Sequence, residues 1–98
     1  MLIAIDYDFT YTLDPAFWDK MIHAARARGH GVVCITNREQ PPAADEPQPP
    51  VEVICSPEHY KSDMAARHRL VVDVWIDDAP GTIEQGRFLD WSDEGEGG

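Results

Sequence analysis

No segment of the sequence contains the roughly 18 to 20 consecutive apolar residues that a membrane-spanning helix requires. The opening residues, MLIAIDYD, also lack the basic start and the apolar length of a secretory signal. Both absences argue against a membrane partner and against export. We therefore expect a cytoplasmic protein.

Basic residues are scarce, because 8 Lys and Arg residues stand against 18 Asp and Glu residues, which gives a net charge of -10. A field of this sign repels phosphate backbones and anionic lipid head groups, so general nucleic-acid affinity is disfavoured. Part of the charge lies in a Gly-spaced run from Asp90 to Gly98 that has little to bury. A chain of 98 residues has room for one core. We expect a single domain over residues 1–91 and an acidic flexible tail over residues 92–98.

Cysteine is almost absent, and the two that occur, Cys34 and Cys55, each lie inside an apolar run. Such thiols behave as small buried hydrophobic groups, so free cysteines are favoured over a disulfide. The sequence also contains no His or Cys cluster with the spacing of a zinc site. A structural disulfide or zinc centre is therefore not expected.

Several segments carry clear secondary-structure signals. Asp14 followed by Pro15 predicts a helix start, apolar residues then recur at helical spacing, and Gly29 predicts its end. Ser56 with Pro57 predicts a second helix running towards His68. Apolar runs rich in β-branched residues predict four strands, at Leu2–Ile5, Gly31–Thr36, Val51–Cys55 and Val71–Ile76.

The remaining segments are shorter or less regular. Glu39–Pro50 is rich in Pro and Ala and predicts a loop over the surface. A short helix is predicted around Thr82–Gln85, followed by an edge strand at Arg87–Trp91. Strands that alternate with helices indicate an α/β fold with a central parallel sheet.

Polar residues follow three of the predicted strands, at Asp6–Asp8, Thr36–Arg38 and Asp77–Asp78. Ligands of α/β folds gather at the carboxyl ends of the strands, so these groups are expected to converge. One residue separates Asp6 from Asp8, and an extended chain would point both carboxylates the same way. Together with Asp77 and Asp78 they form a set of hard oxygen ligands that suits Mg²⁺.

A simpler interpretation is that these aspartates are solvated groups at strand ends. That interpretation would be favoured for one pair of acids. Two pairs, each after an apolar strand and with a Thr and a Lys between them in order, favour a functional site.

These motifs resemble those of the haloacid dehalogenase superfamily. Its first motif, an apolar strand followed by Asp-x-Asp-x-Thr/Val, corresponds to IAIDYDFT, and its second, a strand ending in Thr or Ser, to VVCIT with Thr36. The third, a Lys near a helix start, corresponds to Lys61, and the fourth, a strand ending in paired acids, to VWIDD. The resemblance covers residues 1–84 and implies a three-layer, Rossmann-like domain.

The resemblance also implies site roles. Asp6 would be the nucleophile that forms an aspartyl-phosphate, and Asp8 would protonate the leaving oxygen and then activate water. Mg²⁺ would be held by Asp6, the backbone carbonyl of Asp8 and the Asp77/Asp78 pair, while Thr36 and Lys61 would bind phosphoryl oxygens. Lys61 could instead be a solvated helix lysine, with Arg67 or Arg69 in its place.

Family members usually carry a cap domain, but neither Thr10–Pro15 nor Arg38–Pro50 is long enough to form one. By resemblance, cap-less members act on macromolecular ends or rely on partners to close the site. TNRE and IDDAPGTIE are also similar to the 3'-phosphatase domain of phage-type polynucleotide kinases, which would assign Arg38, with its neighbour Asn37, to substrate binding.

The expected function is therefore Mg²⁺-dependent hydrolysis of a phosphomonoester, by default a small one such as a nucleotide or sugar phosphate. A polynucleotide 3'-phosphatase and a catalytically silent binding or regulatory domain are the alternatives. A second copy of the chain could cover an exposed apolar helix face, so a homo-oligomer is also possible.

Overall fold

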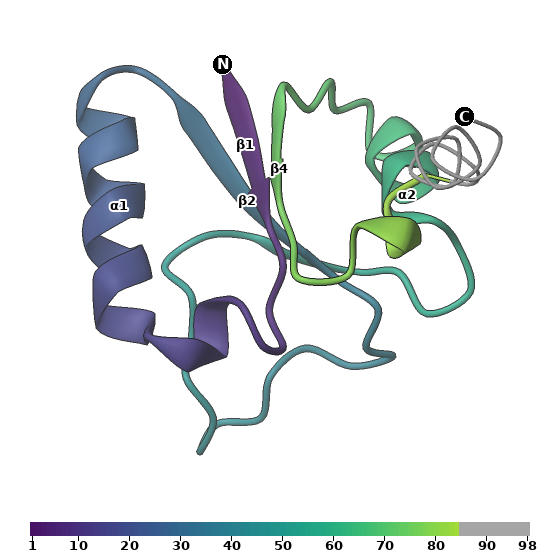
Figure 1. Ribbon diagram of the computed structural model, residues 1–98, viewed down its shortest axis with the longest axis horizontal. Helices are drawn as coiled ribbons and strands as arrows, with labels where there is room; N and C mark the ends of the chain where they lie inside the picture. The colour runs from purple at the N-terminus through teal and green to yellow at the C-terminus, as the bar shows by residue number, and fades with distance from the viewer. Residues whose placement is uncertain (85–98) are drawn as a thin grey trace, which may run out of the picture.

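The computed structural model describes residues 1–84, in which a helix follows the first and the third strand and a loop joins the second strand to the third (Figure 1). Its strands are β1 Leu2–Ile5, β2 Gly31–Thr36, β3 Val53–Cys55 and β4 Val74–Ile76. Its helices are α1 Pro15–Ala27 and α2 Lys61–Arg67, with short 3₁₀ turns η1 Tyr11–Leu13 and η2 Pro80–Thr82. The predicted α/β class is confirmed.

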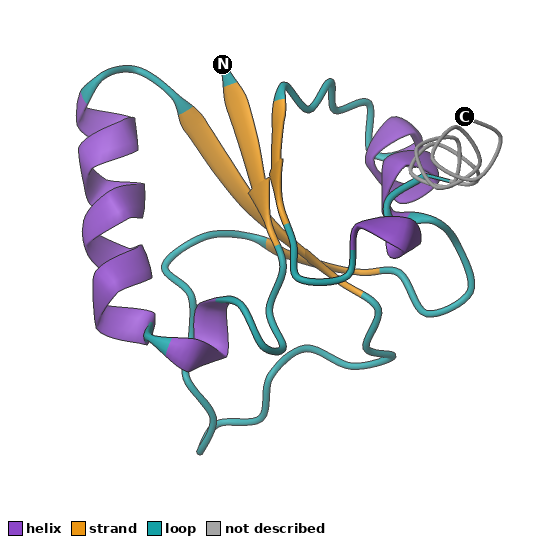
Figure 2. Ribbon diagram, in the orientation of Figure 1, coloured by secondary structure: helices purple, strands orange, loops and turns teal. Residues whose placement is uncertain are grey.

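The strands of the described region form one parallel sheet in the order β3-β2-β1-β4 (Figure 2). Ile5, the last residue of β1, lies in register with Cys34 of β2 on one side and with Ile76 of β4 on the other. Parallel strands end at a common edge of the sheet. The polar residues that follow β1, β2 and β4 therefore share that edge, as the sequence predicted.

Each face of the sheet packs against one helix. Alternate residues of the strands point to opposite faces, so β1 gives Ile3 and Ile5 to one apolar cluster and Ala4 to the other. The first cluster includes Ile22 of α1, and the second includes Ala65 of α2. Figure 1 shows the sheet between these two helices.

Helix α1 begins and ends at its predicted positions. The Asp14 carboxylate accepts a hydrogen bond from the backbone N–H of Phe17 at 3.2 Å, and Pro15 occupies the first turn. Gly29 follows the helix with φ of 84°, a left-handed conformation that glycine adopts without a steric penalty. Residues directly beside the helix were therefore sufficient to predict where it begins and ends.

Helix α2 begins at Lys61, so the predicted start at Ser56 and Pro57 is wrong. The backbone N–H of Ser56 donates to the carbonyl of Thr36 at 2.7 Å, which extends the β2–β3 ladder by one residue. The Ser56 hydroxyl donates to the His59 carbonyl at 2.8 Å. Ser56 is thus bound to the end of the sheet and cannot cap a helix.

Strands β3 and β4 are shorter than predicted, because β3 begins at Val53 rather than Val51 and β4 at Val74 rather than Val71. Before β4, the Asp73 carboxylate accepts a hydrogen bond from the backbone N–H of Leu2 at 2.7 Å. The backbone N–H of Asp73 also donates to the Leu2 carbonyl at 2.9 Å, so Asp73 ties the chain to β1 directly before the strand begins.

The last predicted elements are only partly within the described region. In place of a helix around Thr82–Gln85, the structure has the 3₁₀ turn η2 at Pro80–Thr82, in which Thr82 N–H donates to the Ala79 carbonyl at 3.0 Å. Pro80 and Gly81 favour this short turn over a longer helix. Gln85, the edge strand at Arg87–Trp91 and the tail lie outside the described residues.

The Pro-rich segment 39–50 is a loop, as predicted, and it is hydrogen bonded to residues that follow β1. The hydroxyls of Tyr7 and Tyr11 donate to the carbonyls of Pro47 and Gln48 at 2.7 and 3.2 Å.

Both cysteines are free thiols, as expected. No helix within residues 1–84 is long and apolar enough to cross a membrane.

Candidate active site

The candidate site lies at the carboxyl edge of the sheet, where the chain leaves β1 and β4. Asp6 follows Ile5 and Asp77 follows Ile76, and these two isoleucines are paired in the sheet. The backbone N–H of Asp6 also donates to the Ile76 carbonyl at 2.9 Å. Strand register therefore holds Asp6 and Asp77 next to each other.

Lys61 joins the two carboxylates. Its ammonium nitrogen, Nζ, lies 2.8 Å from Asp6 Oδ1 and 2.5 Å from Asp77 Oδ2. The Lys61 and Asp77 side chains are each only 2% exposed, and Asp6 is 8% exposed. A lysine this buried requires paired charges, so Lys61 is not a solvated helix residue. The described structure leaves no need for Arg67 or Arg69 in this position.

Asp78 completes an acidic cluster with Asp6 and Asp77. One oxygen atom from each carboxylate lies within 4.8 Å of the others, and the set runs from buried Asp6 to exposed Asp78. Thr10 Oγ1 donates to Asp78 Oδ1 at 3.4 Å, and the backbone N–H of Ala79 donates to Asp77 Oδ1 at 2.9 Å. Hard carboxylate oxygens with one solvent-facing member fit a partly hydrated Mg²⁺ ion.

Burial raises the pKa of Asp6 from its ordinary value of 3.8 to about 6. The hydrogen bond from Lys61 acts in the opposite direction, and the neighbouring carboxyl of Asp78 raises the pKa further. Burial therefore favours the protonated form of Asp6 despite the Lys61 ammonium group beside it. A divalent cation at the cluster would favour the ionised form.

Asp8 is held by Arg38 rather than by the acidic cluster. The Arg38 Nε and Nη2 atoms donate to the two Asp8 carboxylate oxygens at 2.9 and 2.8 Å. Nη1 of the same guanidinium donates to Glu46 Oε1 at 2.8 Å, and its Cζ lies 4.8 Å from the centroid of the Tyr7 ring. A bidentate pair of this kind fixes the orientation of the carboxylate.

Thr36 and Asn37 lie at the same edge but make other contacts. Thr36 is 1% exposed, and its hydroxyl oxygen accepts a hydrogen bond from the backbone N–H of Arg38 at 3.2 Å. The Asn37 side-chain amide donates to the Ser56 carbonyl at 2.8 Å. Thr36 thus shapes the turn that carries Arg38, while Asn37 lies on the side facing α2.

The structure therefore gathers the predicted residues into two groups. One consists of Asp6, Asp77, Asp78 and Lys61, and the other of Asp8 and Arg38.

Three neighbours of this site had no predicted role or an undecided one. Glu46 pairs with Arg38, Thr10 with Asp78, and the buried Tyr7 ring underlies the Arg38 guanidinium. Tyr7 stands between Asp6 and Asp8 in the sequence, which marks it as a residue near the site. The sequence alone did not decide whether its ring lines the site entrance or packs beneath it. Glu46 is one acid within a Pro-rich loop, and no periodicity marks it.

Comparison of this chain with protein-family models, with curated proteins and with solved structures gave no match.

Proposed function

We propose that this chain is a Mg²⁺-dependent phosphomonoester hydrolase that acts through an aspartyl-phosphate on Asp6. In this proposal its α/β fold is a cap-less, Rossmann-like variant of the haloacid dehalogenase fold. The observation that carries the proposal is the buried ammonium of Lys61, which bridges Asp6 and Asp77 beside Asp78. It joins three of the four motifs on which the sequence resemblance rests.

Asp6, Asp77 and Asp78 are the residues that would hold Mg²⁺, with the Asp8 backbone carbonyl as the fourth ligand implied by the resemblance. Bound there, the cation would reduce the repulsion between an anionic phosphate and the Asp6 carboxylate. Lys61 contributes one fixed positive charge, which would reduce the same repulsion. Arg38 offsets Asp8 and Glu46, so Lys61 and the cation would together balance the remaining acids of the site, Asp6, Asp77 and Asp78.

In the first step, a carboxylate oxygen of Asp6 attacks phosphorus, and the phosphorus–oxygen bond to the alcohol breaks. The departing oxygen takes a proton from the Asp8 carboxyl group, and the phosphoryl group remains on Asp6. Both Asp8 oxygens accept hydrogen bonds from Arg38 in the structure. Asp8 must therefore release one of them in order to carry the proton.

In the second step, water attacks the phosphoryl group and Asp8 accepts its proton. The bond between phosphorus and Asp6 breaks, which regenerates both carboxyl groups and releases inorganic phosphate. Asp8 is 41% exposed at its side chain, so water and an alcohol group can both reach it. Asp6 thus acts as a buried nucleophile, and Asp8 acts as a solvent-accessible acid and base.

Arg38 is suited to hold the phosphoryl group during both steps. Its guanidinium has five N–H groups, of which two bind Asp8 and one binds Glu46. The remaining two make no hydrogen bond within residues 1–84, and the side chain is 30% exposed. Lys61 would contact the phosphoryl oxygens from the buried side, while Thr36 supports the turn that presents Arg38.

The test is hydrolysis of p-nitrophenyl phosphate with Mg²⁺ and with EDTA, for the wild type, Asp6→Asn and Asp45→Asn. Asp45→Asn is the matched control, because Asp45 is an exposed loop residue outside the site. We expect turnover that needs Mg²⁺, that Asp6→Asn abolishes and that Asp45→Asn retains. Acid-quenched wild-type protein should carry a phosphoryl group on the peptide that contains Asp6, detected by mass spectrometry.

Turnover that persists in EDTA or in Asp6→Asn would contradict the mechanism. Mg²⁺ binding without any turnover or phosphorylated Asp6 would instead identify a catalytically silent binding domain. Release of phosphate from a 3'-phosphorylated oligonucleotide in preference to small esters would favour the polynucleotide alternative, which the net charge of -10 disfavours.

A further inference from the structure

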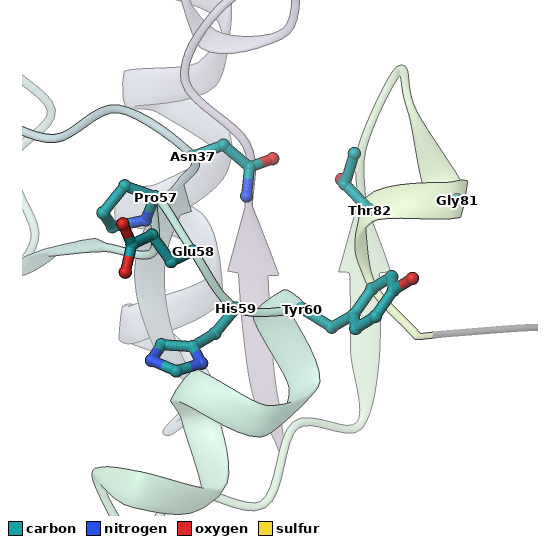
Figure 3. Close-up of a pocket in the computed structure, with 7 residues that line it drawn as sticks. All are labelled: Asn37, Pro57, Glu58, His59, Tyr60, Gly81 and Thr82. Carbon is teal, nitrogen blue, oxygen red and sulfur yellow. The ribbon is translucent and has the colours of Figure 1, made fainter.

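A pocket of about 370 Å³ adjoins the proposed phosphatase site (Figure 3). Two of its lining residues are direct chain neighbours of site residues, because Asn37 follows Thr36 and Tyr60 precedes Lys61. Gly81 and Thr82 belong to η2, the turn that follows Asp78. The pocket therefore lies at the carboxyl edge of the sheet, the edge that also carries the acidic cluster.

Hydrogen-bond acceptors dominate the polar lining of this pocket. Because the Asn37 amide nitrogen donates to Ser56, its carbonyl oxygen is left to face the opening, and Figure 3 shows it directed towards Thr82. The Thr82 hydroxyl donates to the Ala79 carbonyl at 2.8 Å, so it too offers lone pairs to the pocket. Glu58 adds a carboxylate. A ligand with several hydroxyl donors matches these acceptors.

The charge of the pocket lining disfavours an anionic ligand. None of the seven described lining residues is Lys or Arg, and Glu58 is acidic. Asp77 and Asp78 come shortly before η2 in the chain, and the whole chain carries a charge of -10. Among the described lining residues only His59 can carry a positive charge, so an anionic group on the leaving alcohol would meet mainly like charge here.

We propose that this pocket binds the leaving alcohol of the substrate and selects an uncharged, hydroxyl-rich group of monosaccharide size. The inference rests on the proposed phosphatase function and adds the substrate class. Small-molecule sites begin at about 300 Å³, so a pocket of about 370 Å³ suits one sugar ring rather than a larger group. The Tyr60 ring, which is 36% exposed, offers an apolar face for the C–H side of such a ring.

Two substrates of nearly equal size test the proposal. Glucose 6-phosphate and 6-phosphogluconate present the same phosphoryl group, but the second carries a carboxylate at the far end. We expect kcat/KM to favour glucose 6-phosphate by about tenfold, the effect of one unfavourable charge contact. The preference should fall several-fold in Glu58→Lys and persist in Asp45→Asn, which removes a charge outside the pocket.

Hydrolysis of p-nitrophenyl phosphate separates the possible failures. If the wild type hydrolyses this ester but shows equal kcat/KM for the two sugar phosphates, or if Glu58→Lys leaves their ratio unchanged, the pocket assignment is wrong and the phosphatase proposal stands. If the wild type hydrolyses none of the three esters in the presence of Mg²⁺, the proposed function fails and the pocket assignment fails with it.

Discussion

Asp6 is buried at the end of β1 and yet has to be ionised to act as a nucleophile. Burial raises its pKa to about 6 without a metal ion, although Lys61 hydrogen bonds to it. A cation at Asp6, Asp77 and Asp78 would favour the ionised form. In the proposed mechanism, metal binding and activation of the nucleophile are therefore linked at this one carboxyl group.

The raised pKa predicts an unusual pH dependence of stability in EDTA. The folded state holds the Asp6 proton between pH 3.8 and about 6, where the unfolded state has lost it. The resulting stabilisation is present at pH 4 and is lost as the pH rises through 6, by at most about 3 kcal/mol. Asp6→Asn cannot ionise, so its free energy of unfolding should fall less between pH 4.5 and 7.

Urea denaturation of both proteins at these two pH values measures the difference. Carboxyl groups outside the acidic cluster contribute equally to the two proteins, so the wild type minus variant comparison reports on Asp6 and its coupling to Asp77 and Asp78. An identical pH dependence in the wild type and Asp6→Asn would show that Asp6 titrates normally.

In the proposed mechanism, Glu46 would compete with a phosphoryl group for Arg38, because its carboxylate accepts a hydrogen bond from the guanidinium. The Arg38 guanidinium, together with a hydrogen bond from the Ala43 backbone, lowers the pKa of Glu46, which therefore stays ionised beside the site at neutral pH. Glu46→Gln should lower the inhibition constant of inorganic phosphate by about threefold, because a nearby like charge is removed. Asp45→Asn, with the same change in net charge but no contact with Arg38, should leave it unchanged.

This prediction is measured as phosphate inhibition of p-nitrophenyl phosphate hydrolysis at fixed ionic strength. Equal effects of the two substitutions would mean that only the total charge matters and that the Glu46–Arg38 contact does not.

At the scale of elements, the end of α1 depends on the conformation of Gly29. A Cβ atom at Gly29 would meet nothing within 4 Å, but its φ of 84° is unfavourable for any other residue except Asn or Asp. Gly29→Ala should therefore lower the free energy of unfolding by about 1 to 2 kcal/mol through the backbone alone. Gly81→Ala, which has equal space and no positive φ, is the matched control.

Urea denaturation of both variants gives the comparison. A loss in Gly81→Ala as large as that in Gly29→Ala would indicate that the left-handed conformation is not the cause.

The elements that sequence reasoning located well are those set by local signals. β1, β2 and α1 have apolar periodicity and capping residues within their own segments. The start of α2 was misplaced because Ser56 bonds to Thr36, twenty residues earlier in the chain, and no local pattern reports that contact. The start of β4 depends in the same way on the distant pair of Asp73 and Leu2.

The site residues divide in the same way, into those that general rules predicted and those whose positions depend on distant contacts. The convergence of Asp6, Asp77 and Thr36 followed from the rule that parallel strands end at one edge. The resemblance assigned Lys61 to the site as a ligand of phosphoryl oxygens, but its position between the Asp6 and Asp77 carboxylates was not predicted. The pairing of Arg38 with Asp8 and Glu46 depends on the path of the loop 39–50, which composition alone does not determine.

At the scale of the whole molecule, a net charge of -10 in 98 residues opposes folding through mutual repulsion, and the acidic cluster concentrates part of it. Mg²⁺ should therefore raise the melting temperature in two ways, by general screening and by binding at Asp6, Asp77 and Asp78. Binding adds about 2.7 kcal/mol of stability when the free ion is at 100 times its dissociation constant.

Thermal melts in MgCl₂ and in NaCl of equal ionic strength separate these two contributions, since only binding distinguishes the salts. Asp78→Asn removes the solvent-facing ligand of the cluster, so the additional gain in MgCl₂ should shrink in this variant and remain in Asp45→Asn. If both variants keep the full gain, Mg²⁺ acts on the overall charge of the molecule and the cluster is not its binding site. A gain confined to proteins with an intact cluster would make the same three carboxylates responsible for metal-dependent stability and, in the proposed mechanism, for metal-dependent turnover.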